Sequence, residues 1–213
     1  MLFYSMITLA CISITPYTGE SVTFSKDDAG RLPAGWEASQ TGEGKGSIWK
    51  VSADTSAPSG SGFALAQTAK APNACYNIAT LQQSSFRDGV ISVQLKCIAG
   101  ELDQGGGLVW RYQDANNYYI CRFNPLEDNY RVYKVINGKR VQLATKEELT
   151  PPKGKWHTVS VKHAGNKIEC SLDGKALLTA EDASITMPGR VGLWTKADAQ
   201  THFDQLKVEQ LKP

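Results

Sequence analysis

The sequence predicts an all-β protein, and specifically a sandwich of two antiparallel sheets, on three observations. Short runs of β-branched and aromatic residues alternate apolar and polar side chains along most of the chain. Turn-forming residues separate these runs at intervals of about 8–12 residues, while patterns with the helical period are scarce. Asn-Gly at 137–138 and Asp-Gly at 173–174 are two-residue hairpin signals.

The stretch 105–133 has the richest pattern and carries most of the Arg and Tyr residues. Predicted strands in and just beyond it cover residues 108–112, 118–123 and 130–136. Neighbouring side chains in a strand point to opposite faces, so Trp110 and Tyr112 should share one face and Arg111 the other. Arg111 and Arg122 should then lie on one face of adjacent strands.

Further strands are predicted on both sides of this stretch. They cover residues 63–67, 77–81, 90–98, 140–144, 157–163, 167–172, 175–179, 189–195 and 201–209. Residues 20–71 are predicted to be rich in loops apart from the strand at 63–67, and residues 147–149 to form one helical turn. The irregular apolar spacing in the last strand indicates a β-bulge near Asp204. That strand should pair with one from the other end of the chain and close a single domain over residues 20–213.

Composition limits the function classes. A chain of 213 residues with 41% hydrophobic residues is long enough for one large β domain. A net charge of +2 without a concentrated basic patch argues against a nucleic-acid ligand.

Residues 1–19 are predicted to be a signal or N-terminal tail. Residues 1–18 contain no Lys, Arg, Asp or Glu, and residues 2–14 are mostly apolar. This run is too short for a membrane span of about 20 residues and is typical of a secretory signal. The alternative is an edge strand at 8–14. Thr-Leu-Ala-Cys at 8–11 is loosely similar to a lipoprotein signal, which makes Cys11 a candidate lipid anchor. We therefore expect an exported protein (periplasmic, cell surface or secreted).

The other four cysteines are Cys75, Cys97, Cys121 and Cys170. In an exported protein they would allow three pairings. The last three, however, alternate in step with apolar strand residues, which favours buried free thiols over disulfides. No Cys or His pair has the spacing of a metal site.

Several motifs, in this order, resemble the concanavalin A-like lectin/glucanase superfamily. They are Gly-Gly-Leu-Val-Trp-Arg-Tyr at 106–112, Asn-Asn-Tyr-Tyr at 116–119, Tyr-Lys-Val-Ile-Asn-Gly-Lys-Arg at 133–140, Trp-His-Thr-Val at 156–159, Gly-Arg-Val-Gly-Leu-Trp-Thr-Lys-Ala-Asp at 189–198 and Phe-Asp-Gln-Leu at 203–206. Within that superfamily the chain is most similar to laminin-G-like jelly rolls and to bacterial 3-keto-disaccharide hydrolase domains. The resemblance implies a jelly roll with a concave and a convex sheet, and a glycan across the concave face.

Five residues are candidates for that glycan-binding face: Arg111, Tyr118, Arg122, Arg131 and Tyr133. Aromatic rings pack on pyranose faces, and guanidinium groups donate to hydroxyls or carboxylates. The alternative is cross-strand pairing of these arginines with nearby acids.

The resemblance also implies a structural Ca²⁺ held with the help of Asp204, because jelly-roll glycan-binding modules use a last-strand Asp in this way. The alternative for Asp204 is bonding to backbone amides at the bulge. No other cofactor is expected.

Three functions remain open. The first is an exported glycan-binding or glycan-associated domain, expected to be a monomer. The second is a glycoside hydrolase or 3-keto-glycoside-processing enzyme, with Glu101, Asp103, Asp114 and His202 as candidate acids or bases. Glu101-Leu102-Asp103 lacks the third carboxylate of the family 16 glucanase motif and lies in a Gly-rich turn. The third is a laminin-G-like protein-interaction module.

Overall fold

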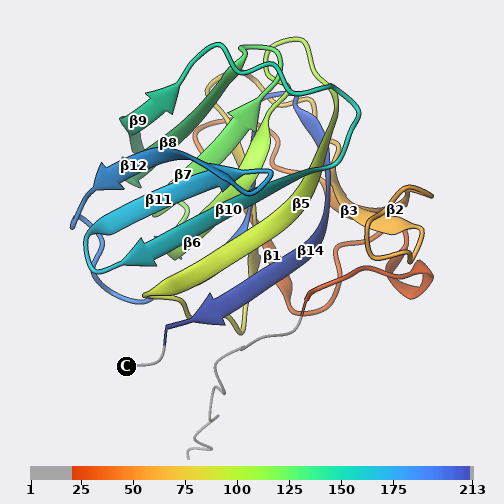
Figure 1. Ribbon diagram of the computed structural model, residues 1–213. Helices are drawn as coiled ribbons and strands as arrows, with labels where there is room; N and C mark the ends of the chain where they lie inside the picture. The colour runs from red at the N-terminus through yellow and green to blue at the C-terminus, as the bar shows by residue number, and fades with distance from the viewer. Residues whose placement is uncertain (1–20, 212–213) are drawn as a thin grey trace, which may run out of the picture.

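The computed structural model describes residues 21–211, which form a two-sheet antiparallel jelly-roll sandwich. Each sheet has seven strands, and a short 3₁₀ helix, η1 (Lys26–Asp28), precedes them. Figure 1 shows the two layers, with β12, β11, β10, β5 and β14 in front of β9, β8, β7 and β6. The predicted fold class is confirmed.

The first sheet has the order β1 (Trp36–Thr41), β4 (Tyr76–Leu81), β13 (Arg190–Lys196), β6 (Gly106–Asp114), β7 (Asn117–Asn124), β8 (Asn129–Ile136) and β9 (Lys139–Lys146). The second sheet has the order β12 (Lys175–Glu181), β11 (Lys167–Leu172), β10 (His157–Ala164), β5 (Gly89–Ala99), β14 (Gln200–Gln210), β3 (Phe63–Gln67) and β2 (Trp49–Ala53).

The main core lies between the two sheets. Leu108 and Trp110 of the first sheet pack in one cluster with Val93, Val161 and Phe203 of the second. Strict alternation in β5 and β10 places every second side chain in this layer, as the sequence pattern predicts.

The four cysteines in the described residues are buried and free. Cys121 and Cys170 pack in the layer between the sheets, and Cys97 lies in the same core. The prediction of buried thiols is confirmed. Burial raises the pKa of Cys97 to about 12, so this thiol is uncharged at neutral pH.

The secondary structure differs from the prediction in two places. The loop-rich segment 20–71 also contains β1 and β2, and residues 147–149 form no helical turn. β1 lies at a sheet edge and most of its residues after Trp36 are polar, so the pattern gave little signal. β2 does alternate, with Trp49 and Val51 buried, but it is only five residues long and was not recognised as a strand within the loop-rich segment. The predictions for residues 1–19, including the lipid anchor at Cys11, fall outside the described residues.

A further correction concerns strand β6. The pairing of β6 with β7 is irregular between Trp110 and Asp114, and Arg111 has a positive φ of 45°. Because extra residues in one strand shift its alternation, Tyr112 turns to the face opposite Trp110. The expectation that these two rings share a face was therefore wrong.

The expected bulge in the last strand is confirmed. The register of β14 against β5 shifts between Asp204 and Lys207, and Gln205 has a φ of 52°. β14 also pairs with β3, and Val22 bridges to Leu206, so the last strand closes the sheet with segments from the start of the chain.

His163 is a buried histidine at one end of the core. Its Nδ1 accepts a hydrogen bond of 2.9 Å from the indole N–H of Trp110, which places the proton of the neutral ring on Nε2. Burial, together with the nearby Arg111 guanidinium, lowers the pKa of His163 to about 4.

His163 should make the fold sensitive to acid. Its pKa in the unfolded chain is near 6.5, above the folded value, so the unfolded state binds the proton first. The free energy of unfolding should be unaffected above pH 6.5 and fall between pH 6.5 and 4, by about 1.4 kcal/mol per unit of pKa difference. The measurement is urea unfolding across this range for the wild type and for His163→Gln, which can still accept from Trp110. Equal pH slopes in the two proteins would contradict the prediction.

Candidate functional site

A second apolar cluster lies on the outer face of the first sheet. Its members come from that sheet alone, so it is separate from the layer between the sheets. They are Ile78, Val109, Tyr112, Tyr118, Ile120, Tyr133, Val135 and Trp194, with Tyr76 packed against them. These clustered side chains are almost fully buried although they lie on an outer face, so other side chains of that face must cover them.

Arg140 covers three aromatic rings of this cluster. Its guanidinium carbon is 4.6 Å from the ring centre of Tyr133, 4.9 Å from that of Tyr76 and 6.0 Å from that of Trp194. Stacking on rings of this kind is a favourable cation–π arrangement. We call Tyr76, Arg122, Tyr133, Arg140 and Trp194 the arginine–aromatic face.

Arg122 is the second cation of this face and is only 1% exposed. It donates to Glu127 over 2.7 Å, to Asn129 over 2.9 Å and to the Tyr133 hydroxyl over 3.4 Å. Its Nε atom is buried and has no hydrogen-bond partner among the described residues. Burial raises the pKa of Glu127, but the hydrogen bond and charge of Arg122, together with Asn129 and Arg131, hold that pKa below its usual range.

A buried carboxyl lies beside this face. Asp103, in the turn before β6, accepts from the Gly105 amide and from Asn124 through Oδ1. Its Oδ2 is buried, lies 3.8 Å from Lys196 Nζ, and has no hydrogen-bond partner within residues 21–211. Burial raises the pKa of Asp103 above its ordinary value, and the positive charge of Arg122 offsets part of that rise. A carboxyl of this kind can hold or transfer a proton.

The structure brings four of the five predicted binding residues to this outer face. Arg122 and Tyr133 belong to the arginine–aromatic face, and Tyr118 lies fully buried in its floor, hydrogen-bonded to Thr41. Arg131 lies opposite Arg122 in the neighbouring strand and pairs with Glu127 and Glu147.

Arg111 is placed elsewhere. The irregularity in β6 directs its guanidinium to the carbonyl oxygens of Arg87, Gly165 and Ile185 and to the Asp88 carboxylate. These bonds join loops at one end of the sandwich, so Arg111 does not lie with Arg122 as the alternation predicted.

Sequence reasoning missed Arg140 and Tyr76. The signal for Arg140 was present, because the Asn137-Gly138 hairpin pairs Val135 with Arg140. Since Val135 shares a face with Tyr133, the hairpin register places Arg140 beside that ring. Tyr76 had no such local signal, because its strand β4 pairs with β13, which is more than 100 residues away in the sequence.

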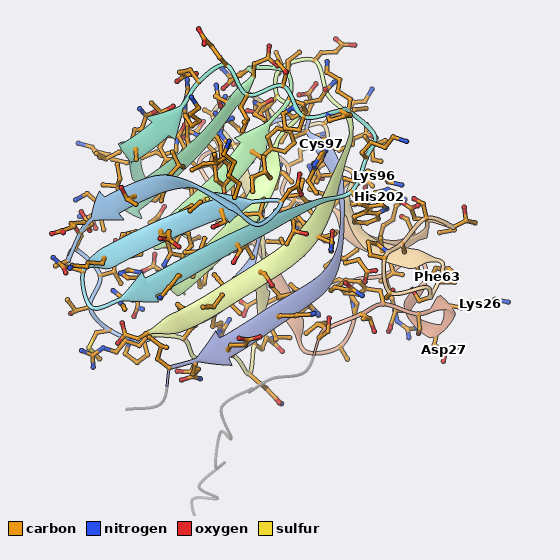
Figure 2. The ribbon with its side chains drawn as sticks, viewed as in Figure 1. Lys26, Asp27, Phe63, Lys96, Cys97 and His202 are labelled. Atoms are coloured by element: carbon orange, nitrogen blue, oxygen red, sulfur yellow. The ribbon has the colours of Figure 1, made fainter. Side chains whose placement is uncertain are left out.

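The other candidate acids and bases are dispersed. Glu101 is exposed, and Asp114 accepts from Asn116 and Asn117 within its own turn. His202 lies on the second sheet beside Lys96, as Figure 2 shows, and bonds to Asp54 over 2.7 Å. His202 therefore does not face the arginine–aromatic face.

Asp204 holds backbone amides. Its Oδ2 accepts from Ser59 over 2.8 Å and its Oδ1 from Gln205 over 2.9 Å. Within the described part of the chain, no three Asp, Glu, His or Cys side chains are grouped to hold a metal ion. Calcium at Asp204 remains a prediction.

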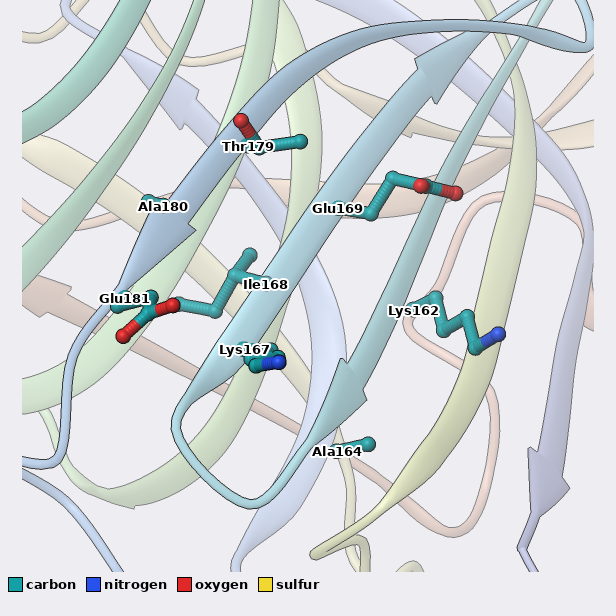
Figure 3. A pocket seen from close by; sticks show the side chains of 8 residues that line it. All are labelled: Lys162, Ala164, Lys167, Ile168, Glu169, Thr179, Ala180 and Glu181. Carbon is teal, nitrogen blue, oxygen red and sulfur yellow. The ribbon is translucent and has the colours of Figure 1, made fainter.

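A shallow pocket of about 630 Å³ opens on the second sheet, over β10, β11 and β12 (Figure 3). Lysine and glutamate side chains alternate around it, among them Lys162, Lys167, Glu169 and Glu181. These side chains are exposed, as is usual on a sheet face that contacts solvent. The pocket is nevertheless an alternative binding site, and an experiment must distinguish it from the arginine–aromatic face.

Three solved structures share the fold at low sequence identity. The carbohydrate binding module CBM66 from Bacillus subtilis is 20% identical, with a TM-score of 0.64, over 83% of this chain and 96% of that one. The β-glucanase of Bacillus licheniformis is 15% identical, with a TM-score of 0.58, over 92% and 100%. A glycoside hydrolase family 16 endo-glucanase from Bacteroides ovatus is 11% identical, with a TM-score of 0.58, over 85% and 98%.

A family model described as "3-keto-alpha-glucoside-1,2-lyase-like domain" matches residues 25–209. No curated protein matches the sequence. No helix within residues 21–211 is long and apolar enough to cross a membrane.

Proposed function

Since the chain belongs to the family of 3-keto-alpha-glucoside-1,2-lyase-like domains, we propose that it binds a glycan or glycoside on the outer face of its first sheet. The observation that carries this proposal is the position of Arg140, stacked over three aromatic rings with no hydrogen bond from its side chain to any described residue. Around it lie Arg122, with a free Nε, and Lys196.

Sugars suit this chemistry because each hydroxyl both donates and accepts hydrogen bonds. Arg140 and Lys196 supply donors to these hydroxyls. Oriented polar groups beside apolar rings are the usual composition of a small-ligand site. The fold gives independent support, since similar structures include a carbohydrate binding module and two glucanases.

Two lysine variants test which face binds. We expect Lys196→Met to weaken glycan binding by about tenfold, the effect of losing one charged hydrogen bond, while Lys167→Met in the pocket on the second sheet changes nothing. The measurement is a glycan array followed by calorimetry on the glycans that bind. The opposite ranking of the two variants would move the site to the pocket, and an array without any bound glycan would refute the proposal.

An enzyme is the second candidate, and Asp103 is the observation that favours it. Eliminating across C1 and C2 of a 3-keto-glycoside needs a base for the C2 proton and an acid for the departing oxygen. Asp103 has a raised pKa and a buried oxygen without a hydrogen-bond partner among the described residues, beside the arginine–aromatic face. Turnover of bound 3-keto-glycosides that Asp103→Asn abolishes without changing affinity would establish this activity.

We also propose that the protein is exported, as residues 2–14 suggest from their apolar composition. Cell fractionation of the full chain checks this prediction directly, and recovery in the cytoplasm alone would contradict it.

A further inference from the structure

Arg140 is a cation without a charged partner. On the outer face of the first sheet, Arg122 pairs with Glu127, Arg131 with Glu147, and Lys196 approaches Asp103. Arg140 forms no ion pair with any residue between 21 and 211, and its Nη1 atom is buried without a hydrogen-bond partner there. The face therefore carries one uncompensated positive charge.

Two of the three rings beneath Arg140 are not open platforms for a sugar. Trp194 is 0% exposed and Tyr133 is 4% exposed, because the guanidinium and the neighbouring rings cover them. A pyranose reaching this position meets the guanidinium group instead of an aromatic surface. The nearest group that a ligand contacts is thus a planar, charged fork of N–H donors.

A guanidinium fork matches one ligand group especially well. A carboxylate accepts two parallel hydrogen bonds from it, and such charged bonds are about twice as strong as bonds between neutral groups. Stacking on the rings holds the guanidinium plane in place, so less side-chain entropy is lost when the ligand binds. A neutral sugar would leave the charge of Arg140 without compensation in a partly desolvated position.

We propose that the ligand is an acidic glycan, one that contains uronic acid residues, and that Arg140 binds its carboxylate. This inference rests on the proposed function, since it specifies the ligand of the same face. Lys196, whose side chain is partly exposed, lies farther along the face, where it contacts a neutral hydroxyl of the same glycan.

The experiment compares matched ligands on the full chain. Oligogalacturonates and oligoglucuronates are titrated by calorimetry beside their methyl esters and beside neutral oligosaccharides of the same length. We expect the free acids to bind at least about tenfold more tightly than their esters, with an affinity that falls as salt rises. Arg140→Met should abolish this preference, and Arg140→Lys should retain part of it because it keeps the charge but not the fork.

Arg190→Met is the matched control, because Arg190 also lies on the first sheet but is paired with Glu37. It should keep the preference for the free acids, and circular dichroism should confirm that each variant is folded. Equal affinity of acids, esters and neutral chains would overturn the acidic ligand while leaving glycan binding intact. Binding of none of these sugars or of any arrayed glycan would overturn both.

Discussion

Replacing Arg111 with methionine should lower the free energy of unfolding by about 3–5 kcal/mol, the range for breaking a buried, hydrogen-bonded charge. The side chain is 1% exposed and its guanidinium donates to four acceptors. Methionine fills much of the same volume but cannot donate. It therefore leaves the buried carbonyl of Ile185, and the part-buried carbonyls of Arg87 and Gly165, without these bonds, and an unpaired buried acceptor is costly. Chemical denaturation of the purified variant measures the loss.

Arg131→Met is the control for this experiment. Arg131 bonds to Thr145 and Glu147 at the surface, and exposed ion pairs of this kind contribute little to stability. The Arg131 variant should unfold almost as the wild type does. Similar losses of unfolding free energy at the two positions would show that the hydrogen bonds of Arg111 do not stabilise the fold.

Replacing Asp54 with asparagine should destabilise the protein by about 3 kcal/mol, because it leaves the charge of Lys96 without its partner. Asp54 Oδ2 lies 2.5 Å from Lys96 Nζ, and both side chains are largely buried. Burial alone would raise the pKa of Asp54, but hydrogen bonds from Lys96, His202 and Ser56 hold it far below its usual value. Its contribution is thus fully present above about pH 4, the ordinary carboxyl pKa, and is lost as the pH falls below that value.

A double-mutant cycle with Lys96→Met isolates this pair. The double variant should lose less stability than the two single variants together, because each single change strands the other partner. The Ser56 hydroxyl also accepts hydrogen bonds from Lys96 and from the Trp156 indole. These bonds, together with the ion pair, hold the loop after β2 against β5. Additive losses would contradict a coupled pair.

Much of the fold could be predicted from the sequence because strands such as β5 and β10 alternate strictly and two hairpins close with Asn-Gly or Asp-Gly turns. The hairpins around 138 and 174 are local features, so local patterns fixed their register. β1 could not be found in this way. Its outer residues are polar, and Trp36 is one of only two buried side chains in it.

The candidate site was predicted in part for the same reason. Arg122, Arg131 and Tyr133 lie on one face through simple alternation between adjacent strands. Arg111 fails that rule because a bulge changes the direction of its side chain, and its acceptors come from residues far away in sequence. The free donors of Arg140 are a property of the assembled face, since only the completed sheet brings Tyr76 and Trp194 beneath it.

The last two strands, β13 and β14, have internal positions in the two sheets. β13 lies between β4 and β6, and β14 between β5 and β3. A chain still emerging from the ribosome therefore has both sheets split in two, with unpaired edges where these strands belong. Both sheets can close only after β14 has been synthesised, and until then their unpaired strand edges are open to aggregation.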